Sequence, residues 1–249
     1  MTLPPGTILQ HLYLAERLRG IPPGSFIEVG AGSGELAALL IEHGWHGTAF
    51  ELSTYSAQTA QKRNPQLDVR NHDWLTSPPD EPADLVISSM VIEHLPDDDE
   101  AAFLERARAA LRPNGRLILL VPASPRHWGI EDDIAGHERR YTREHLCGRI
   151  EQLGWRVEHI VGLTYPLSNM LLPISNWLVG RAERSRVELP RMERTARSGH
   201  RRVKGKTTFP RALKVVLNPV TMYPLHLIQK VFSNAEAALV LYLEASLER

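Results

Sequence analysis

The sequence predicts an α/β protein with a doubly wound, mostly parallel, seven-stranded sheet, helices on both faces and a C-terminal insertion or cover. Three observations support this prediction. Strand-like and helix-like runs alternate through the first 160 residues, several strand-like runs are apolar on both faces, and a glycine-rich turn follows the first of them. Alternating strands and helices are typical of a sheet whose parallel strands are joined by helical crossovers.

Short apolar runs bounded by Gly, Pro or Asp indicate six buried strands. They are Ser25–Val29, Ala49–Leu52, Leu67–Arg70, Leu85–Ser89, Leu117–Val121 and Trp155–Val161. Helical spacing between them predicts helices over Glu35–His43, Thr54–Lys62, Asp98–Leu111 and Arg143–Leu153. Ser53 and Thr142 suit N-caps, and Gly154 lies where a helix should end.

The alternation stops after Val161. The range Ile160–Gly180 has no charged residue, but two prolines and two asparagines interrupt it, so it is a poor transmembrane helix and a better interfacial or substrate-covering element. The apolar run Ala237–Glu244 is interpreted as a late strand inserted into the sheet, with a terminal helix as the alternative. The expected organisation is a first domain at 1–160, an apolar and then basic cover at 161–214, and a region at 215–249 that completes the sheet.

The formal net charge of zero conceals an uneven distribution. Residues 1–180 carry 15 Lys/Arg against 23 Asp/Glu, whereas residues 181–214 carry 12 against 3. The single cysteine, Cys147, excludes an internal disulfide, and the first residues lack the pattern of a secretory signal. We therefore expect a cytoplasmic protein, with attachment to the periphery of a membrane as an alternative.

The glycine-rich turn is the strongest local motif. Gly30, Gly32 and Gly34 alternate directly after the first strand, where glycine lets a ligand approach the backbone. A dinucleotide-binding turn would instead have glycine or alanine at position 35, which is Glu35 here. With Glu28 also close, a pyrophosphate would be disfavoured and a cationic ligand favoured.

These residues resemble the class I S-adenosylmethionine (SAM)-dependent methyltransferases, and among them the type-11 small-molecule group. The resemblance continues in order over roughly residues 25–160. Its motifs are Glu28–Gly34, Glu51 after the second strand, Asn71-His-Asp-Trp74, Ser88-Ser-Met-Val-Ile-Glu-His-Leu95, Leu111-Arg-Pro-Asn-Gly-Arg-Leu117 and Gly136-His-Glu-Arg-Arg-Tyr-Thr142. It implies a Rossmann-like fold with SAM as the cofactor.

The resemblance also implies roles for individual residues. Glu51 would accept hydrogen bonds from the ribose diol, Asp73 would meet the adenine amino group, and Trp74 would pack beside the adenine ring. The remaining expected cofactor residues are Glu28, Gly30, Gly32, Gly34, Leu52 and Ser89. Two alternatives stay open, because Glu28 could cap backbone amides of the loop and Trp74 could be ordinary core packing.

The candidate catalytic residues are His94, His137, Arg140 and Tyr141. His94 follows the fourth strand, where a base could face the acceptor, or it could be a structural hydrogen-bonding partner. The other three lie near Glu131, Asp132 and Asp133, and form either an acid/base cluster or a polar helix entrance with Arg140 paired to a carboxylate. A metal held by Asp132, Asp133 and His137 is conceivable, but no further ligand set stands out and no metal is expected.

The sequence therefore predicts methyl transfer from SAM to oxygen or nitrogen of a small-molecule or lipid-like acceptor, by in-line displacement. Residues 160–214 could also contact an anionic membrane. Nucleic acid is an unlikely partner, since the basic run lacks aromatic platforms. The alternatives are an NAD-dependent oxidoreductase and a catalytically inactive SAM-binding partner module.

Overall fold

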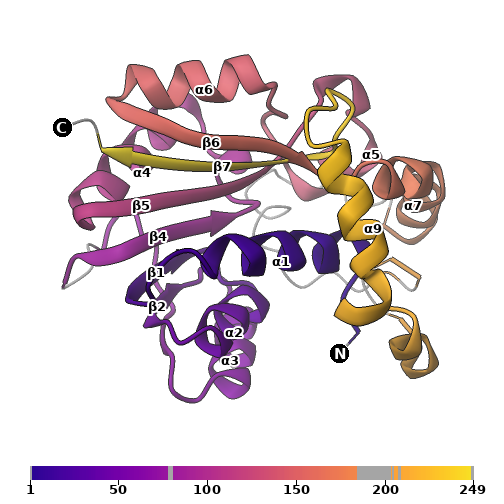
Figure 1. The fold of residues 1–249 in the computed structure, drawn as a ribbon, viewed down its shortest axis with the longest axis horizontal. Helices are drawn as coiled ribbons and strands as arrows, with labels where there is room; N and C mark the ends of the chain where they lie inside the picture. The colour runs from indigo at the N-terminus through magenta and orange to yellow at the C-terminus, as the bar shows by residue number, and fades with distance from the viewer. Residues whose placement is uncertain (1, 78–80, 184–202, 204, 207–208, 248–249) are drawn as a thin grey trace.

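The protein folds around one seven-stranded sheet, as the computed structural model shows for residues 2–77, 81–183, 203, 205–206 and 209–247 (Figure 1). The strand order is β3-β2-β1-β4-β5-β7-β6, and only β7 runs antiparallel to its neighbours. The strands are β1 Ser25–Val29, β2 His46–Phe50, β3 Asp68–Arg70, β4 Ala83–Ser89, β5 Leu111–Pro122, β6 Trp155–Leu163 and β7 Val240–Leu247. The predicted mostly parallel, seven-stranded sheet is confirmed.

Helices cover both faces of the sheet. The α-helices are α1 Pro5–Leu18, α2 Glu35–Glu42, α3 Thr54–Arg63, α4 Asp97–Ala109, α5 Ile130–Ala135, α6 Arg143–Gln152, α7 Leu167–Glu183 and α9 Pro219–Val231. Side chains of α4 and α6 pack with one set of strand residues, and side chains of α1 and α2 pack with the alternate set. Because successive side chains of a strand point to opposite faces, these two clusters are the two layers of a doubly wound fold.

The predicted helix boundaries follow from local hydrogen bonds. The Ser53 side chain accepts from the Ser56 N–H at 3.3 Å, and the Thr142 side chain accepts from the His145 N–H at 3.2 Å, so both are N-caps. Gly154 has a φ of 75°, the left-handed conformation that ends α6. These three short-range predictions are confirmed.

The late strand is also confirmed, and the alternative of a terminal helix is wrong. β7 lies between β5 and β6, where Leu119 pairs with Leu243 and Ile160 pairs with the same Leu243 from the other side. Such a central strand is buried on both faces, which explains its continuous apolar run. The helix α9 precedes it and packs against α1 beside the sheet (Figure 1).

The segment after β6 forms the helix α7, which contains Pro173. No helix among the described residues is both long and apolar enough to cross a bilayer. Much of the basic run at 181–214 lies outside the described residues, so its predicted role as a cover is not addressed by the structure. The helix α1 was not predicted, although Pro5 at its first turn and apolar residues at Ile8, Leu9 and Leu14 follow a helical pattern.

Candidate active site

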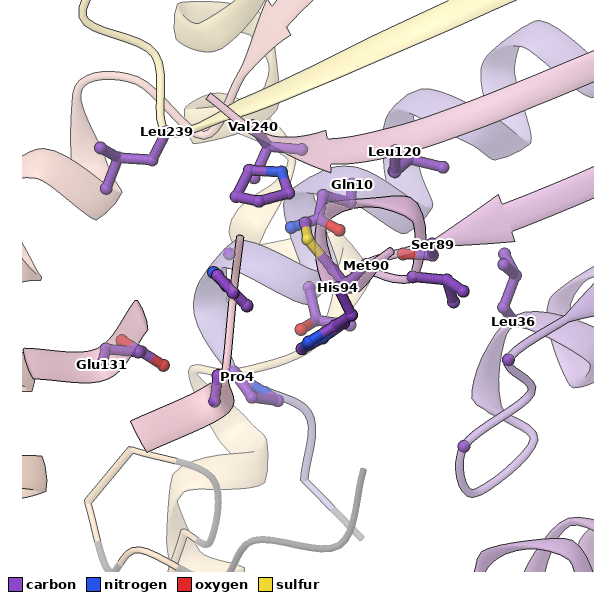
Figure 2. A pocket seen from close by; sticks show the side chains of 18 of the residues that line it. Pro4, Gln10, Leu36, Ser89, Met90, His94, Leu120, Glu131, Leu239 and Val240 are labelled. Carbon is purple, nitrogen blue, oxygen red and sulfur yellow. The ribbon is translucent and has the colours of Figure 1, made fainter. Parts of the chain in front are cut away.

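A cavity of about 1050 Å³ opens at the carboxyl ends of the parallel strands. This is where ligands bind in doubly wound sheets, since the loops after neighbouring strands converge there. Segments far apart in the chain line it, as Figure 2 shows with Pro4 and Gln10 near the N-terminus, Ser89, Met90 and His94 after β4, and Leu239 and Val240 at β7. Side chains of α7 and of the 3₁₀ helix η4 (Arg211–Val215) complete the wall.

The three glycines of the first loop have different surroundings. All three have positive φ, at 79°, 53° and 76° for Gly30, Gly32 and Gly34. A Cβ on Gly30 would overlap the Val91 side chain, and a Cβ on Gly34 would lie 2.7 Å from the Asn64 amide nitrogen. A Cβ on Gly32 would have no protein atom within 4 Å, although Gly32 lines the cavity. Only Gly32 therefore faces space that a ligand can fill.

Glu51 joins the end of β2 to this loop. Its Oε2 accepts the Gly32 N–H at 2.8 Å, and its Oε1 accepts the Ser53 N–H at 2.8 Å. Asn71, after β3, donates to the carbonyl oxygens of Glu51 and Leu52 at 2.8 and 2.9 Å. A carboxylate oxygen has two lone pairs, so these backbone bonds leave Glu51 able to accept from a ribose diol.

Glu28 lies beneath the loop and is 2% exposed. Burial, together with the neighbouring carboxylates of Glu35 and Glu51, raises the pKa of Glu28 to about 8, although the Ala37 N–H acts to lower it. Its Oε2 has no hydrogen-bond partner among the described residues. Glu28 thus contacts the first turn of α2 through the Ala37 N–H rather than an amide of the loop, and it also keeps an unsatisfied oxygen in an acidic environment.

This donor set fits SAM better than a dinucleotide. The carboxylates of Glu35 and Glu51 act on Glu28 beneath the loop, and their negative charge would repel a pyrophosphate and attract the positively charged end of SAM. Leu52 and Asp73 are exposed to solvent, and both line the cavity beyond Glu51, as Ser89 does after β4. A flat ring bound there would pack against the apolar Leu52 side chain and lie near the Asp73 carboxylate.

Trp74 is a core residue that also borders the cavity. It is 2% exposed and packs edge-on against Phe103, with ring centroids 4.9 Å apart, so it belongs to the core. It also lines the cavity. Its contact with adenine stays a prediction.

A second polar cluster lies across the cavity, after β4 and α5. The His137 Nδ1 lies 2.8 Å from Asp132 Oδ1, and the same oxygen accepts from the Arg140 Nε at 2.7 Å. Asp132 is fully buried, and although burial opposes ionisation, its hydrogen bonds with His137 and Arg140 hold its pKa below the usual value. The expected pairing of Arg140 with a carboxylate is thus present. The cluster nevertheless faces the cavity, because His94, His137 and Arg140 all line it.

Glu93 lies behind these histidines and was not among the predicted site residues. Its side chain is fully buried, and neither carboxylate oxygen has a hydrogen-bond partner among the described residues. Burial raises the pKa of Glu93 to about 7, and His137 partly offsets this, with its Nε2 3.8 Å from Glu93 Oε1. Sequence order gave one signal, since Glu93 directly precedes His94, but its burial depends on contacts distant in the chain.

The other two predictions near this cluster place residues elsewhere. Tyr141 is fully buried, does not line the cavity, and donates its hydroxyl hydrogen to Glu100 Oε1 at 3.0 Å. We therefore do not retain it as a catalytic residue. Asp133 accepts the Trp128 indole N–H at 3.0 Å, and Asp132 is bonded to His137, so the conceivable metal set of Asp132, Asp133 and His137 is not assembled.

The helix α1 contributes side chains that sequence reasoning missed. Gln10, His11 and Leu14 line the cavity on the side of the glycine loop. Burial lowers the pKa of His11 to about 4, partly opposed by Glu35, so this imidazole is neutral near pH 7. A neutral imidazole beside the cofactor region can accept or donate a hydrogen bond without adding positive charge.

The comparisons with known proteins agree with this geometry. The family described as "Methyltransferase domain" matches residues 8–160. A "Probable S-adenosylmethionine-dependent methyltransferase" of Mycolicibacterium smegmatis is 26% identical over 140 residues, which are 55% of this chain and 54% of that protein. An uncharacterized methyltransferase of Staphylococcus carnosus is 24% identical over 112 residues, 45% of this chain and 54% of the relative. The chain thus spans about half the length of these curated relatives.

Solved structures extend the likeness to the fold. A glycopeptide N-methyltransferase aligns with a TM-score of 0.55 at 14% identity, over 97% of this chain and 90% of its own. A mitomycin 7-O-methyltransferase aligns with a TM-score of 0.52 at 19% identity, over 63% of this chain and 50% of its own. At such identities the likeness concerns the fold. The chain belongs to the methyltransferase domain family, and its fold is that of the class I SAM-dependent methyltransferases.

Proposed function

We propose that the chain transfers the methyl group of SAM to a small organic acceptor with a largely apolar body. One observation carries this proposal. The same cavity joins the glycine loop and Glu51 to the cluster of His94, His137 and Arg140, and its volume is about 1050 Å³. Single-ligand pockets are ~300–1,000 Å³, so this cavity has room for a cofactor and an acceptor together.

An apolar part of the cavity wall supports an apolar acceptor. It is built from side chains of α7 and of the segment around η4, namely Leu171, Leu172, Ile174, Leu178, Leu213, Val216 and Leu217. Apolar walls with a few polar groups are typical of small-molecule sites. Glycopeptide and mitomycin are the acceptors named for two proteins of similar fold, and neither is a nucleic acid.

The residues have separate tasks in this proposal. SAM supplies an electrophilic methyl group on a sulfonium when it is bound. Gly32 leaves the space for it, Glu51 holds the ribose end, and the carboxylates of Glu35 and Glu51 favour its positive charge. His94 or His137 accepts a proton where the acceptor must lose one, and the apolar wall excludes water and positions the acceptor, which alone supplies much of the rate.

A direct experiment separates the proposed activity from its alternatives. Calorimetric titration with SAM and, separately, with NADH is expected to give binding of SAM alone. Labelled SAM is then incubated with a panel of apolar hydroxyl and amine acceptors, with the Gly32→Val variant as the inactive control. Transfer of label by the unaltered chain supports the enzyme. SAM binding without transfer to any acceptor class would favour the inactive partner module.

We further propose that the acceptor is lipid-like and is reached at an anionic membrane surface. The observation that favours this is the exposure of large apolar side chains on α7, where Met170, Ile174 and Trp177 are 72%, 57% and 62% exposed. The Arg181 guanidinium lies over the Trp177 ring at 5.9 Å, and the basic run of 181–214 follows in the sequence. Aromatic and basic side chains next to exposed aliphatic ones are typical of helices that lie in the membrane interface.

A further inference from the structure

The buried carboxyl group of Glu93 is not explained by methyl transfer. Glu93 is fully buried, yet both of its carboxylate oxygens lack hydrogen-bond partners among the described residues. A buried carboxylate without partners is costly, because it has lost its hydration and gained nothing in exchange. The structure therefore leaves an unsatisfied anionic group at the wall of the cavity.

The hydrogen bond between His137 and Asp132 determines which ring nitrogen of His137 faces Glu93. Its Nδ1 lies 2.8 Å from Asp132 Oδ1, and a carboxylate at that distance fixes the Nδ1–H tautomer, so the lone pair is on Nε2. That Nε2 lies 3.8 Å from Glu93 Oε1, too far for a hydrogen bond. Two lone-pair atoms thus face each other across a gap that a bound cation would fill.

His94 is the third residue of this cluster of potential metal ligands. One ligand atom each from Glu93, His94 and His137 lie within 4.8 Å of one another. The two imidazole rings are 4.8 Å apart between centroids and nearly perpendicular, at 77°. Ligand bonds to such ions are about 2.0–2.2 Å, so ligand atoms of one ion are at most about 4.4 Å apart. Shifts of a few tenths of an ångström would close the set around one ion.

We propose that Glu93, His94 and His137 bind a divalent transition-metal ion, with open coordination positions toward the cavity. Two imidazoles and one carboxylate favour Zn²⁺, Mn²⁺ or Fe²⁺ over Mg²⁺ or Ca²⁺, which prefer oxygen ligands alone. Asp132 acts behind His137 as the carboxylate that orients a metal-ligating histidine. The positive charge of Arg140 is offset by the same Asp132, to which its Nε donates at 2.7 Å.

The proposed ion would lie beside the space assigned to the acceptor. His94 and His137 line the cavity, whereas Glu93 lies behind them, so the free coordination positions face the space assigned to the acceptor. An ion there would bind an acceptor oxygen or nitrogen and make its proton easier to lose, which would replace proton acceptance by His94 or His137, because their free nitrogens would be ligands. This consequence rests on the proposed methyl transfer, whereas the ion site itself does not.

The test uses the full chain without an affinity tag, dialysed against Zn²⁺ and then freed of unbound metal, with bound zinc measured by elemental analysis. One zinc per chain is expected, and Co²⁺ should give a visible absorption spectrum typical of nitrogen ligation. Glu93→Gln and His137→Gln should each weaken zinc binding at least tenfold. The matched control is His127→Gln, because His127 contacts Ser124 and does not line the cavity.

Melting temperature and SAM binding show whether each variant is folded. If Glu93→Gln does not fold, the His137→Gln variant alone tests the site. No retained zinc in the unaltered chain would overturn the proposal and indicate that Glu93 and His137 share a proton instead. Zinc that all three variants retain equally would also overturn it. Failure of zinc binding with intact SAM binding would leave the proposed methyl transfer standing, so the two ideas are tested separately.

Discussion

Glu51 Oε2 accepts a hydrogen bond from the Gly32 N–H at 2.8 Å, so the carboxylate that follows β2 holds the loop that follows β1. The second oxygen of Glu51 is bonded to the Ser53 N–H, which fixes the carboxylate at the cavity wall. The loop and the carboxylate are thus placed together by the parallel pairing of β1 with β2, before any ligand binds. This preorganisation lowers the cost of ordering the site on binding.

We predict that Glu51→Ala weakens SAM binding without unfolding the chain. Charge-assisted hydrogen bonds contribute ~1.5–3 kcal/mol, which corresponds to roughly 10- to 100-fold in affinity. Calorimetric titration measures the change, and Glu42→Gln is the control, because Glu42 is exposed at the end of α2 and does not line the cavity. Unchanged affinity in a folded Glu51→Ala variant would remove Glu51 from the site.

We predict that Gly32→Val abolishes SAM binding more completely than Glu51→Ala does. The branched side chain would fill the space that Gly32 leaves open at the cavity, and it disfavours the φ of 53°. Gly34→Val is the contrasting variant, since its side chain would collide with Asn64 and Ala60 inside the fold. Melting curves should show the larger loss of stability for Gly34→Val. A Gly32→Val protein that binds SAM normally would mean that the loop does not hold the cofactor.

The sequence predicted most of the sheet because each buried strand is a short apolar run with a recognisable end. It missed α1, whose buried residues contact the sheet and α9 and whose polar face lines the cavity, so its pattern is mixed. It missed Glu93 for a different reason. An acidic residue beside a histidine is ordinary in a sequence, and only the packing of η1 (Ile92–His94) against β5 and the turn before Tyr141 removes it from water.

The residue types predicted which contacts form better than they predicted which residues line the site. Arg140 was expected to be paired with a carboxylate or to face a substrate, and the structure shows that it is paired with Asp132 and lines the cavity. Tyr141 follows it by one residue and points into the core, because neighbours on an extended segment face opposite sides. Spacing along the chain could not separate these outcomes, since burial is decided by distant elements.

We predict that Glu28 lowers the stability of the ligand-free protein as the pH rises from about 4.5 to about 8, and that Glu28→Gln removes this contribution. The lowered pKa of His11 acts with the opposite sign between about pH 4 and 6.5, so the unaltered chain and the variant are compared with each other. Burial raises the pKa of Glu28 to about 8, so over this range the folded chain binds more protons than the unfolded chain. The stabilisation is complete below the unfolded pKa and is lost as the pH rises through the folded pKa, with a slope of at most ~1.4 kcal/mol per pH unit for one group.

Urea unfolding at pH 5, 7 and 9 measures the dependence on pH. Glu93, whose pKa burial raises to about 7, contributes with the same sign, so Glu28→Gln should flatten the curve only in part. Glu28→Gln keeps the side-chain volume and can still accept from the Ala37 N–H. A curve for this variant parallel to that of the unaltered chain would show that Glu28 has an ordinary pKa in the folded protein.

Finally, we predict that Ile174→Ser combined with Trp177→Ser lowers the binding of the chain to anionic vesicles by roughly tenfold or more. Fully burying a side chain of this size is worth ~1.5–3 kcal/mol, and each 1.4 kcal/mol is tenfold in affinity, so even partial insertion of two side chains reaches this magnitude. Both residues are exposed on α7, so their loss should leave the melting temperature unchanged.

Tyr55→Ser on α3 is the control, because Tyr55 is also exposed and lies on a helix beside β3, away from α7. Co-sedimentation with vesicles containing phosphatidylserine measures the effect. Neutral vesicles show how much of the binding depends on the charge of the lipid. If the unaltered chain does not sediment with either vesicle, the apolar face of α7 serves the cavity alone, and a freely dissolved acceptor is favoured over a lipid-like one.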